Sequence, residues 1–202
     1  LPSLQRISFT DEKTTVLPKE IAALERLRVL ELSLNRKFKR LHKNLGLATA
    51  LEALLLINLH NLTDISILTR LSKLSHLVFS NTIKLKDYTP LQQLASLRHL
   101  TLASLDLDDA APVAATLTNL TTLDLKSSVR SWTIPAVVTL IESLPNLSAL
   151  GLASADLSFG ALPPLDHIEQ LDLYSLDGLP PGMFSRATRL KALSLQFYSA
   201  DV

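Results

Sequence analysis

A short spacing of leucines recurs along the whole chain and constrains its fold more than any other feature. The spacing is L-x-x-L-x-x-L-x-L, with other apolar residues replacing some of the leucines. Nine copies of it begin at Leu1, Leu24, Ala48, Leu71, Leu94, Leu117, Leu144, Leu165 and Ala187. As a result, leucine accounts for 48 of the 202 residues. A recurring period of this length indicates a repeat architecture, in which each unit buries its apolar face against its neighbours.

The end of each copy predicts a β-strand. Side chains alternate between the two faces of a strand, so both leucines of an x-L-x-L-x stretch point the same way. The rest of each repeat carries turn and short-helix signals, which return the chain to the start of the next strand. Nine parallel strands would form one sheet, and the wider connections on the other side would make the stack curve. We therefore expect an α/β solenoid with the sheet on its concave face.

The segment LPKEIAALERLRVLELSLN, from Leu17 to Asn35, resembles the 23-residue repeats of the leucine-rich-repeat family. The resemblance covers essentially the whole chain. The repeats are similar to those of intracellular plant immune receptors and of bacterial effector proteins. It implies a right-handed solenoid of about nine repeats with short helices or turns on the convex face.

One slot of the repeat departs from the family pattern. The slot that normally holds asparagine does so only at Asn35. The other repeats have Glu12, Leu59, Thr82, Leu105, Ser128, Ala155, Leu176 and Tyr198 there. Buried backbone groups then need other partners or water. We therefore expect an irregular solenoid.

Two connections predict α-helices. Asp108 or Asp109 is expected to cap a short helix that runs through Pro112 to Thr116. In the longest repeat, Thr133 is expected to begin a helix that ends near Ser143.

Composition excludes several classes of protein. The mean hydropathy is +0.25, but the longest apolar run, Ala53 to Ile57, is far shorter than the roughly 18 to 20 residues of a membrane-spanning helix. The chain has no cysteine, so disulfides, thiolate metal sites and cysteine nucleophiles are excluded. Neither G-x-S-x-G, H-E-x-x-H nor a phosphate-binding loop is present, so we expect no catalysis and no cofactor.

The sequence gives no sign of a division into separate domains. Because no linker-like stretch divides it, we expect residues 1–202 to form a single leucine-rich-repeat domain that is one part of a longer protein. No signal-like segment is visible near Leu1, and we expect a cytoplasmic location.

The register of the repeats predicts which side chains lie on the concave face. The central row is Ser8, Glu31, Leu55, Val78, Thr101, Asp124, Gly151, Asp172 and Ser194. The row two residues further on is Thr10, Ser33, Ile57, Ser80, Ala103, Lys126, Ala153, Tyr174 and Gln196. These two rows are the surface on which a partner is expected to bind.

Three groups of residues are candidates for partner binding. The charged cluster, comprising Asp124, Lys126, Asp172 and Tyr174, surrounds two small residues and predicts a notch with charged walls. The apolar patch comprises Leu55, Ile57 and Val78; such outward apolar residues are also common on ordinary surfaces or can pack against a neighbouring domain. Trp132, in the enlarged loop from Ser127, either anchors a partner or covers the interior of its own repeat.

Two further features have structural as well as functional interpretations. The basic run from Asn35 to Lys43 could contact phosphates or an anionic membrane surface, although a solvated outer face explains it without any ligand. His76 and His99 occupy the same slot in successive repeats and should lie side by side. Because no third ligand accompanies them, we expect no metal site there.

These observations favour a non-enzymatic module that recognises another protein, or a neighbouring domain of the same chain, on its concave face. We expect no nucleic acid as partner. By resemblance, such modules form the sensing part of an immune receptor or select the target of a bacterial effector. The alternatives are the target-selecting domain of a larger enzyme, such as an effector ubiquitin ligase, and a repeat that associates with itself.

Overall fold

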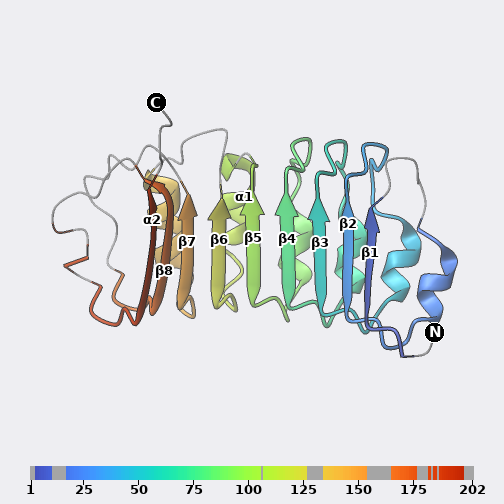
Figure 1. Cartoon of the computed structure of the whole chain (residues 1–202), viewed down its shortest axis with the longest axis horizontal. Coiled ribbons are helices and arrows are strands. Elements are labelled where there is room, and N and C mark those ends of the chain that lie inside the picture. Colours follow the sequence, from blue (N-terminus) through green and yellow to red (C-terminus); the bar gives the residue numbers. More distant parts are fainter. Residues whose placement is uncertain are drawn as a thin grey trace.

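A computed structural model describes residues 3–10, 17–105, 107–126, 134–153, 165–176, 182, 184–185 and 187–197. Nine strands form one sheet in the order of the sequence, and every neighbouring pair is parallel (Figure 1). The strands are β1 Arg6–Thr10, β2 Val29–Ser33, β3 Ala53–Ile57, β4 His76–Ser80, β5 His99–Ala103, β6 Thr122–Lys126, β7 Ala149–Ala153, β8 Gln170–Leu176 and β9 Ala192–Phe197. The expected solenoid is confirmed.

Short helices cover one face of the sheet and leave the other open (Figure 1). Among the described residues, four are 3-10 helices: η1 Lys19–Ala23, η2 Lys43–Leu47, η3 Ser66–Arg70 and η4 Thr89–Gln93. Two are α-helices: α1 Leu107–Ala114 and α2 Ile134–Ser143. In the described part of the chain, no helix has the length and apolar character needed to cross a membrane.

The predicted helix boundaries agree with α2 but not with α1. The expected helix ending near Ser143 is confirmed by α2. The helix expected through Pro112 is confirmed by α1, but its predicted bounds are wrong, because it runs from Leu107 to Ala114. Asp108 and Asp109 therefore lie in its first turn, where the helix dipole interacts favourably with negative charge. Neither precedes the helix as a cap.

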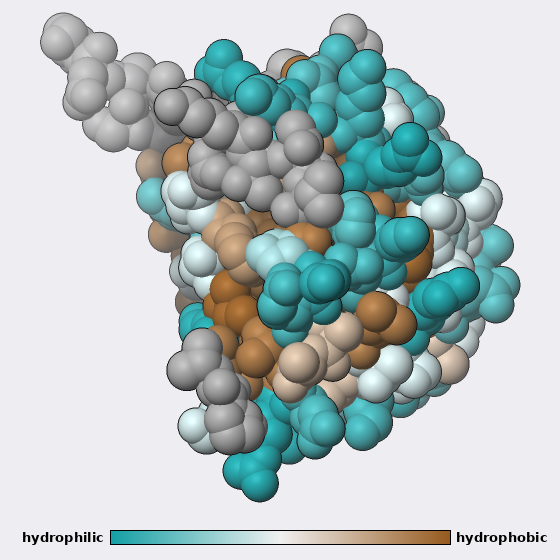
Figure 2. Space-filling model, turned by 90° about the vertical axis from the view of Figure 1, so that its right-hand side faces the viewer, coloured by the Kyte–Doolittle hydropathy of each residue, from teal (hydrophilic) through white to brown (hydrophobic). Residues whose placement is uncertain are grey.

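The leucines of the strands build the core. The second and fourth residues of β2 to β8 have at most 2% of their surface exposed. At the N-terminal end, Ile7 and Phe9 of β1 are partly buried against the same core. Figure 2 looks onto this end and shows hydrophobic side chains in the middle with hydrophilic ones around them. At the other end, Leu193, Leu195 and Phe197 of β9 are 36–54% exposed.

The solenoid is more regular than its substituted asparagine slot predicts. From β1 to β7 the register runs without a shift, and the irregularity lies between β8 and β9, near Leu173 and Leu176. Asn35 fulfils the usual role, since its buried Oδ1 accepts hydrogen bonds from the backbone N–H groups of Lys37 and Phe38. Leu59, Thr82 and Leu105 fill the same slot as buried packing residues.

A row of left-handed residues provides the missing backbone partners. The residue before the asparagine slot has a positive φ of 54° to 56° in four successive repeats, at Leu34, Asn58, Asn81 and Ser104. In each case its N–H donates to the carbonyl of the last residue in the following strand, at 2.6 to 3.0 Å. The turns are thus tied to one another, and the stack stays regular without an asparagine ladder.

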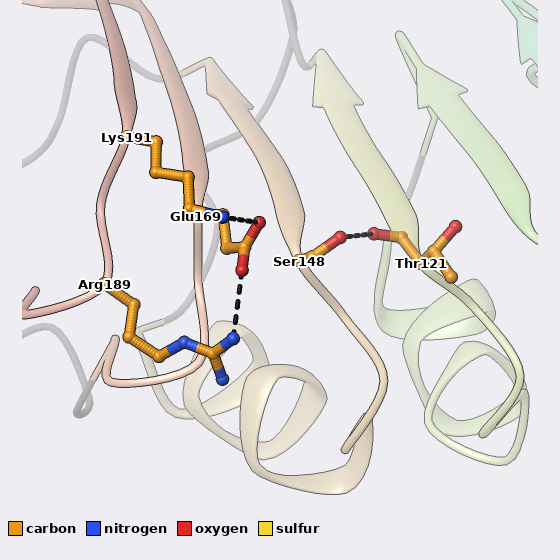
Figure 3. Close-up of polar contacts among 5 residues, drawn as sticks. All are labelled: Thr121, Ser148, Glu169, Arg189 and Lys191. Atoms are coloured by element: carbon orange, nitrogen blue, oxygen red, sulfur yellow. Dashed lines mark hydrogen bonds and ion pairs between the residues drawn. The ribbon is translucent and has the colours of Figure 1, made fainter.

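Polar side chains also link the repeats at the edge where the strands begin (Figure 3). The Ser148 hydroxyl donates to the carbonyl of Thr121, as the Thr121 hydroxyl does to the carbonyl of Arg98. Further along, Glu169 accepts from both Arg189 and Lys191, at 3.0 and 2.9 Å. These two cations hold the pKa of Glu169 below its ordinary value, the hydrogen bond from Lys191 being the largest cause.

Candidate functional site

The strand pairing places the charged cluster as the repeat register predicts. Asp124 on β6 pairs with Gly151 on β7, which pairs with Asp172 on β8. Lys126, Ala153 and Tyr174 pair in the same order in the next row. All of these residues lie on the open face of the sheet, so residues two repeats apart in the sequence lie within a span of three neighbouring strands.

Lys126 connects the members of the charged cluster. Its Nζ atom lies 2.8 Å from Oδ2 of Asp124 on the same strand. The same ammonium lies 5.0 Å from the centroid of the Tyr174 ring, within the range of a cation–π interaction. Asp172 accepts a hydrogen bond of 2.9 Å from the Gln170 amide. These contacts link Asp124, Lys126 and Tyr174 to one another, while Asp172 is held by Gln170 on its own strand.

The small residues do not leave the open notch that the sequence predicts. A Cβ atom on Gly151 would lie 2.5 Å from Oδ1 of Asp124, so this carboxylate rests directly against the glycine backbone. Lys126 reaches toward Tyr174 past Ala153, which is only 6% exposed. The expected notch is occupied by the side chains of its own walls, because glycine and alanine let them lean inward.

The proton affinities of the cluster follow from these contacts. The hydrogen bond to Asp124 raises the pKa of Lys126 above its ordinary value, so the ammonium stays charged. Burial is the main cause that raises the pKa of Tyr174, and the carboxylates of Asp124 and Asp172 add to the effect. A neutral phenol beside a fixed ammonium and two carboxyl groups suits polar recognition, and nothing in the arrangement activates a nucleophile.

The apolar patch is found, but its side chains are less exposed than expected. Leu55 on β3 pairs with Val78 on β4, and Ile57 lies on the same face one pair further along. All three are half-buried. They offer a shallow aliphatic surface two strands away from the charged cluster.

The two histidines lie between these groups, side by side as the sequence predicts, and their rings stack. His76 and His99 pair across β4 and β5, with ring centroids 3.9 Å apart and planes 13° apart. Burial first, and the neighbouring His76 second, lower the pKa of His99 below its ordinary value. Within the described ranges, no group of three or more metal-ligating side chains comes together.

One predicted site residue lies outside the described residues, and one polar network was not predicted from the sequence. Trp132 lies outside the described residues. The polar network at the other edge was missed: the Asn81 side chain donates to Oδ1 of Asn58 and to Nε2 of His60, at 2.9 Å each. Its signal was an asparagine in the same slot of two successive repeats, a residue that tolerates a positive φ.

Sequence comparison and structure comparison give different results for this chain. No protein-family model matches the sequence, and no curated protein is significantly similar to it. The fold, in contrast, matches many solved structures.

Three of these structures illustrate the likeness. An internalin, InlF of Listeria monocytogenes, is 24% identical, with a TM-score of 0.60 over 93% of this chain and 53% of the internalin. A complex of TLR13 with the RNA ssRNA13 gives 19% identity and a TM-score of 0.63 over 98% of this chain and 33% of the receptor. The Drosophila Toll–Spatzle complex gives 19% identity and a TM-score of 0.59 over 96% of this chain and 33% of the matched chain.

These matches define the architecture. The chain is a leucine-rich-repeat solenoid, and the resemblance read from its sequence is confirmed at the level of the fold. It spans about half of the internalin and a third of the two receptors. Two of the three similar structures are complexes with a ligand.

Proposed function

We propose that the chain is a non-enzymatic recognition module that binds a partner protein on the open, concave face of its sheet. The observation that carries this proposal is the charged cluster, in which Lys126 is held between Asp124 and Tyr174 on a rigid sheet. A preorganised surface loses little entropy on binding, so a few fixed side chains can supply most of the affinity. The apolar patch, two strands away, would add a second contact area.

The experiment compares the wild-type chain with a variant carrying Lys126→Ala, Asp172→Ala and Tyr174→Ala. Proteins from the source organism that bind immobilised wild type would be identified and purified, and their affinities measured by calorimetry. A matched control variant carries Arg6→Ala, Ser8→Ala and Glu31→Ala on β1 and β2 of the same face. Circular dichroism verifies that both variants fold.

Loss of affinity by 100-fold or so in the cluster variant, with the control close to wild type, would support the proposal. Equal binding by both variants would place the site elsewhere, with the apolar patch and Trp132 next to be tested. A partner bound on the convex helices would contradict it.

The alternative is that the module selects targets for a larger enzyme, such as an effector ubiquitin ligase. The chain covers only part of the length of the structures it resembles, and residues 1–202 would then be one domain of that enzyme. The full-length open reading frame decides between the two, since a ligase would carry a catalytic domain in the same chain. A cytoplasmic location remains part of the proposal.

A further inference from the structure

The C-terminal edge of the sheet carries a second surface, separate from the concave face. The segments that follow β2, β3 and β4 are residues 34–42, 58–65 and 81–88, of nearly equal length. They project side by side beyond the arrowheads of these strands (Figure 1). Their tips therefore lie at similar height and form a nearly flat edge.

Every third residue of these loops anchors them in the core. Phe38 and Leu41 in the first loop, Leu62 in the second, and Leu85 and Tyr88 in the third are at most 5% exposed. Hydrogen bonds then fasten the loops to one another. The Asn61 amide donates to the carbonyl of Arg36, and the Thr63 hydroxyl and N–H donate to that of Lys39. The edge is thus rigid.

Between the anchors, the first and third loops carry six exposed cations, whereas the second loop carries no Lys or Arg. We define the basic rim as Arg36, Lys37, Lys39, Arg40, Lys84 and Lys86. Among the described residues, Arg36, Lys37, Lys39 and Lys84 form no ion pair, whereas Lys86 pairs with Asp109. The two acids of these loops stay charged, because hydrogen bonds from Ser66 and Thr89 lower the pKa of Asp64 and Asp87, but they balance only two of the six cations. The surplus positive charge is left facing solvent.

Two large aliphatic side chains stand among these cations. Leu34, the first residue of the first loop, is 46% exposed, and Ile83, in the third loop, is 51% exposed. Leu34 holds a positive φ of 56°, a conformation that costs a leucine energy and that turns it out of the core. No aromatic side chain is exposed on these three loops, so the stacking platform that single-stranded nucleic acid requires is lacking there.

We propose that the basic rim docks on the surface of an anionic phospholipid bilayer. The two groups of cations, four in the first loop and two in the third, match the phosphate and carboxylate groups of the headgroups. Leu34 and Ile83 would enter the boundary between headgroups and acyl chains. The C-terminal ends of the strands would then face the membrane, and the concave face would remain accessible to its partner. This inference does not depend on the function proposed for that face.

Vesicle flotation with the 202-residue chain tests the proposal. One set of vesicles contains phosphatidylcholine alone and the other also contains phosphatidylserine. The rim variant carries Arg36→Glu, Lys37→Glu and Lys39→Glu. The charge-matched control carries Lys19→Glu, Arg26→Glu and Lys73→Glu, three exposed cations away from the rim. A third variant carries Leu34→Asn and Ile83→Asn, and circular dichroism verifies that all three fold.

The expected result is binding to phosphatidylserine vesicles only, weakened by salt. Each basic residue near such a surface strengthens binding by about fivefold, so the rim variant should lose on the order of 100-fold or more while the control loses far less. The aliphatic variant should lose about tenfold.

Three outcomes would overturn the proposal. The first is no binding to either vesicle. The second is equal loss in the rim variant and its control, which would mean that only overall charge matters. The third is binding to a single-stranded oligonucleotide that the rim variant abolishes while the aliphatic variant binds vesicles like wild type, which would reassign the rim to nucleic acid.

Discussion

Gly151 determines how the charged cluster is arranged, although it has no side chain of its own. The Asp124 carboxylate lies where a Cβ atom would be, with its Oδ1 atom 2.5 Å from that position. The Gly151→Ala variant should therefore push Asp124 aside and loosen its contact with Lys126. We expect a loss of about 1 kcal/mol in the free energy of unfolding, because the methyl group overfills a packed site. Urea denaturation measures it.

A double-mutant cycle separates this clash from other effects of the methyl group. Once Asp124→Ala has removed the carboxylate, adding Gly151→Ala should cost almost nothing, since alanine suits a strand better than glycine. The two single variants would then show a coupling energy of about 1 kcal/mol. Additive losses would contradict the proposed contact.

His99 makes stability depend on pH. Burial and the stacked His76 hold its pKa below the ordinary value of 6.5, so the unfolded chain binds a proton more readily than the folded chain. The stabilisation from the neutral ring is complete above about pH 6.5 and is lost as the pH falls through the folded pKa. The His99→Gln variant should therefore lose less stability than wild type between about pH 8 and pH 5.

NMR titration of the imidazole signals supplies the matching control. In the His76→Gln variant the pKa of His99 should rise toward its ordinary value, because the repulsion between two positive rings is removed. An unchanged pKa would mean that burial alone is responsible for the shift.

At the scale of the elements, the strands were predictable and the turns were not. Alternating leucines fix which face of each strand is buried, and a shift of one residue would expose every one of them. The register from β1 to β7 follows from that constraint. The start of α1 was misjudged, because Asp108 or Asp109 was taken as its cap although the helix already begins at Leu107.

The turns after the strands depend on backbone geometry that leucine spacing does not encode. Leu34 adopts a positive φ in the same slot as Asn58 and Asn81, so residue type alone could not predict that conformation there. The regularity of the stack arises from hydrogen bonds between these turns, which are made by backbone groups and leave little trace in the sequence.

Asn35 tests how far one turn depends on its side chain. Its Oδ1 accepts two backbone hydrogen bonds, of 2.8 and 3.1 Å, in a position that is 2% exposed. Asn35→Ala would leave the N–H groups of Lys37 and Phe38 without that acceptor, so we expect a loss of about 2 to 3 kcal/mol in the free energy of unfolding. Chemical denaturation of the purified variant measures this loss.

Asn35→Asp is the control, because it retains an oxygen at the same place. It should cost less than the alanine variant. Equal losses in both would show that the amide group contributes through another contact.

At the scale of the whole molecule, the repeat period predicted which residues share a face but not how they touch. Asp124 and Asp172 are almost 50 residues apart in sequence, yet the period places them two strands apart. The lean of Asp124 onto Gly151, the reach of Lys126 to Tyr174 and the depth of the apolar patch depend on side-chain rotamers. Register places a side chain on a face, and local packing decides its direction.

A solenoid also distributes its stability unevenly, because each repeat contacts only its neighbours. Leu102 on β5 lies between two covering repeats and is 2% exposed, whereas Leu195 on β9 is 36% exposed. Leu102→Ala should therefore cost about 2 to 5 kcal/mol, and Leu195→Ala about 1 kcal/mol or less. Hydrogen exchange should show the same gradient, with the amides of β3 to β6 protected longest and those of β9 exchanging first. Equal costs at the two leucines would mean that β9 is covered in solution, for instance by a second molecule stacked on that end.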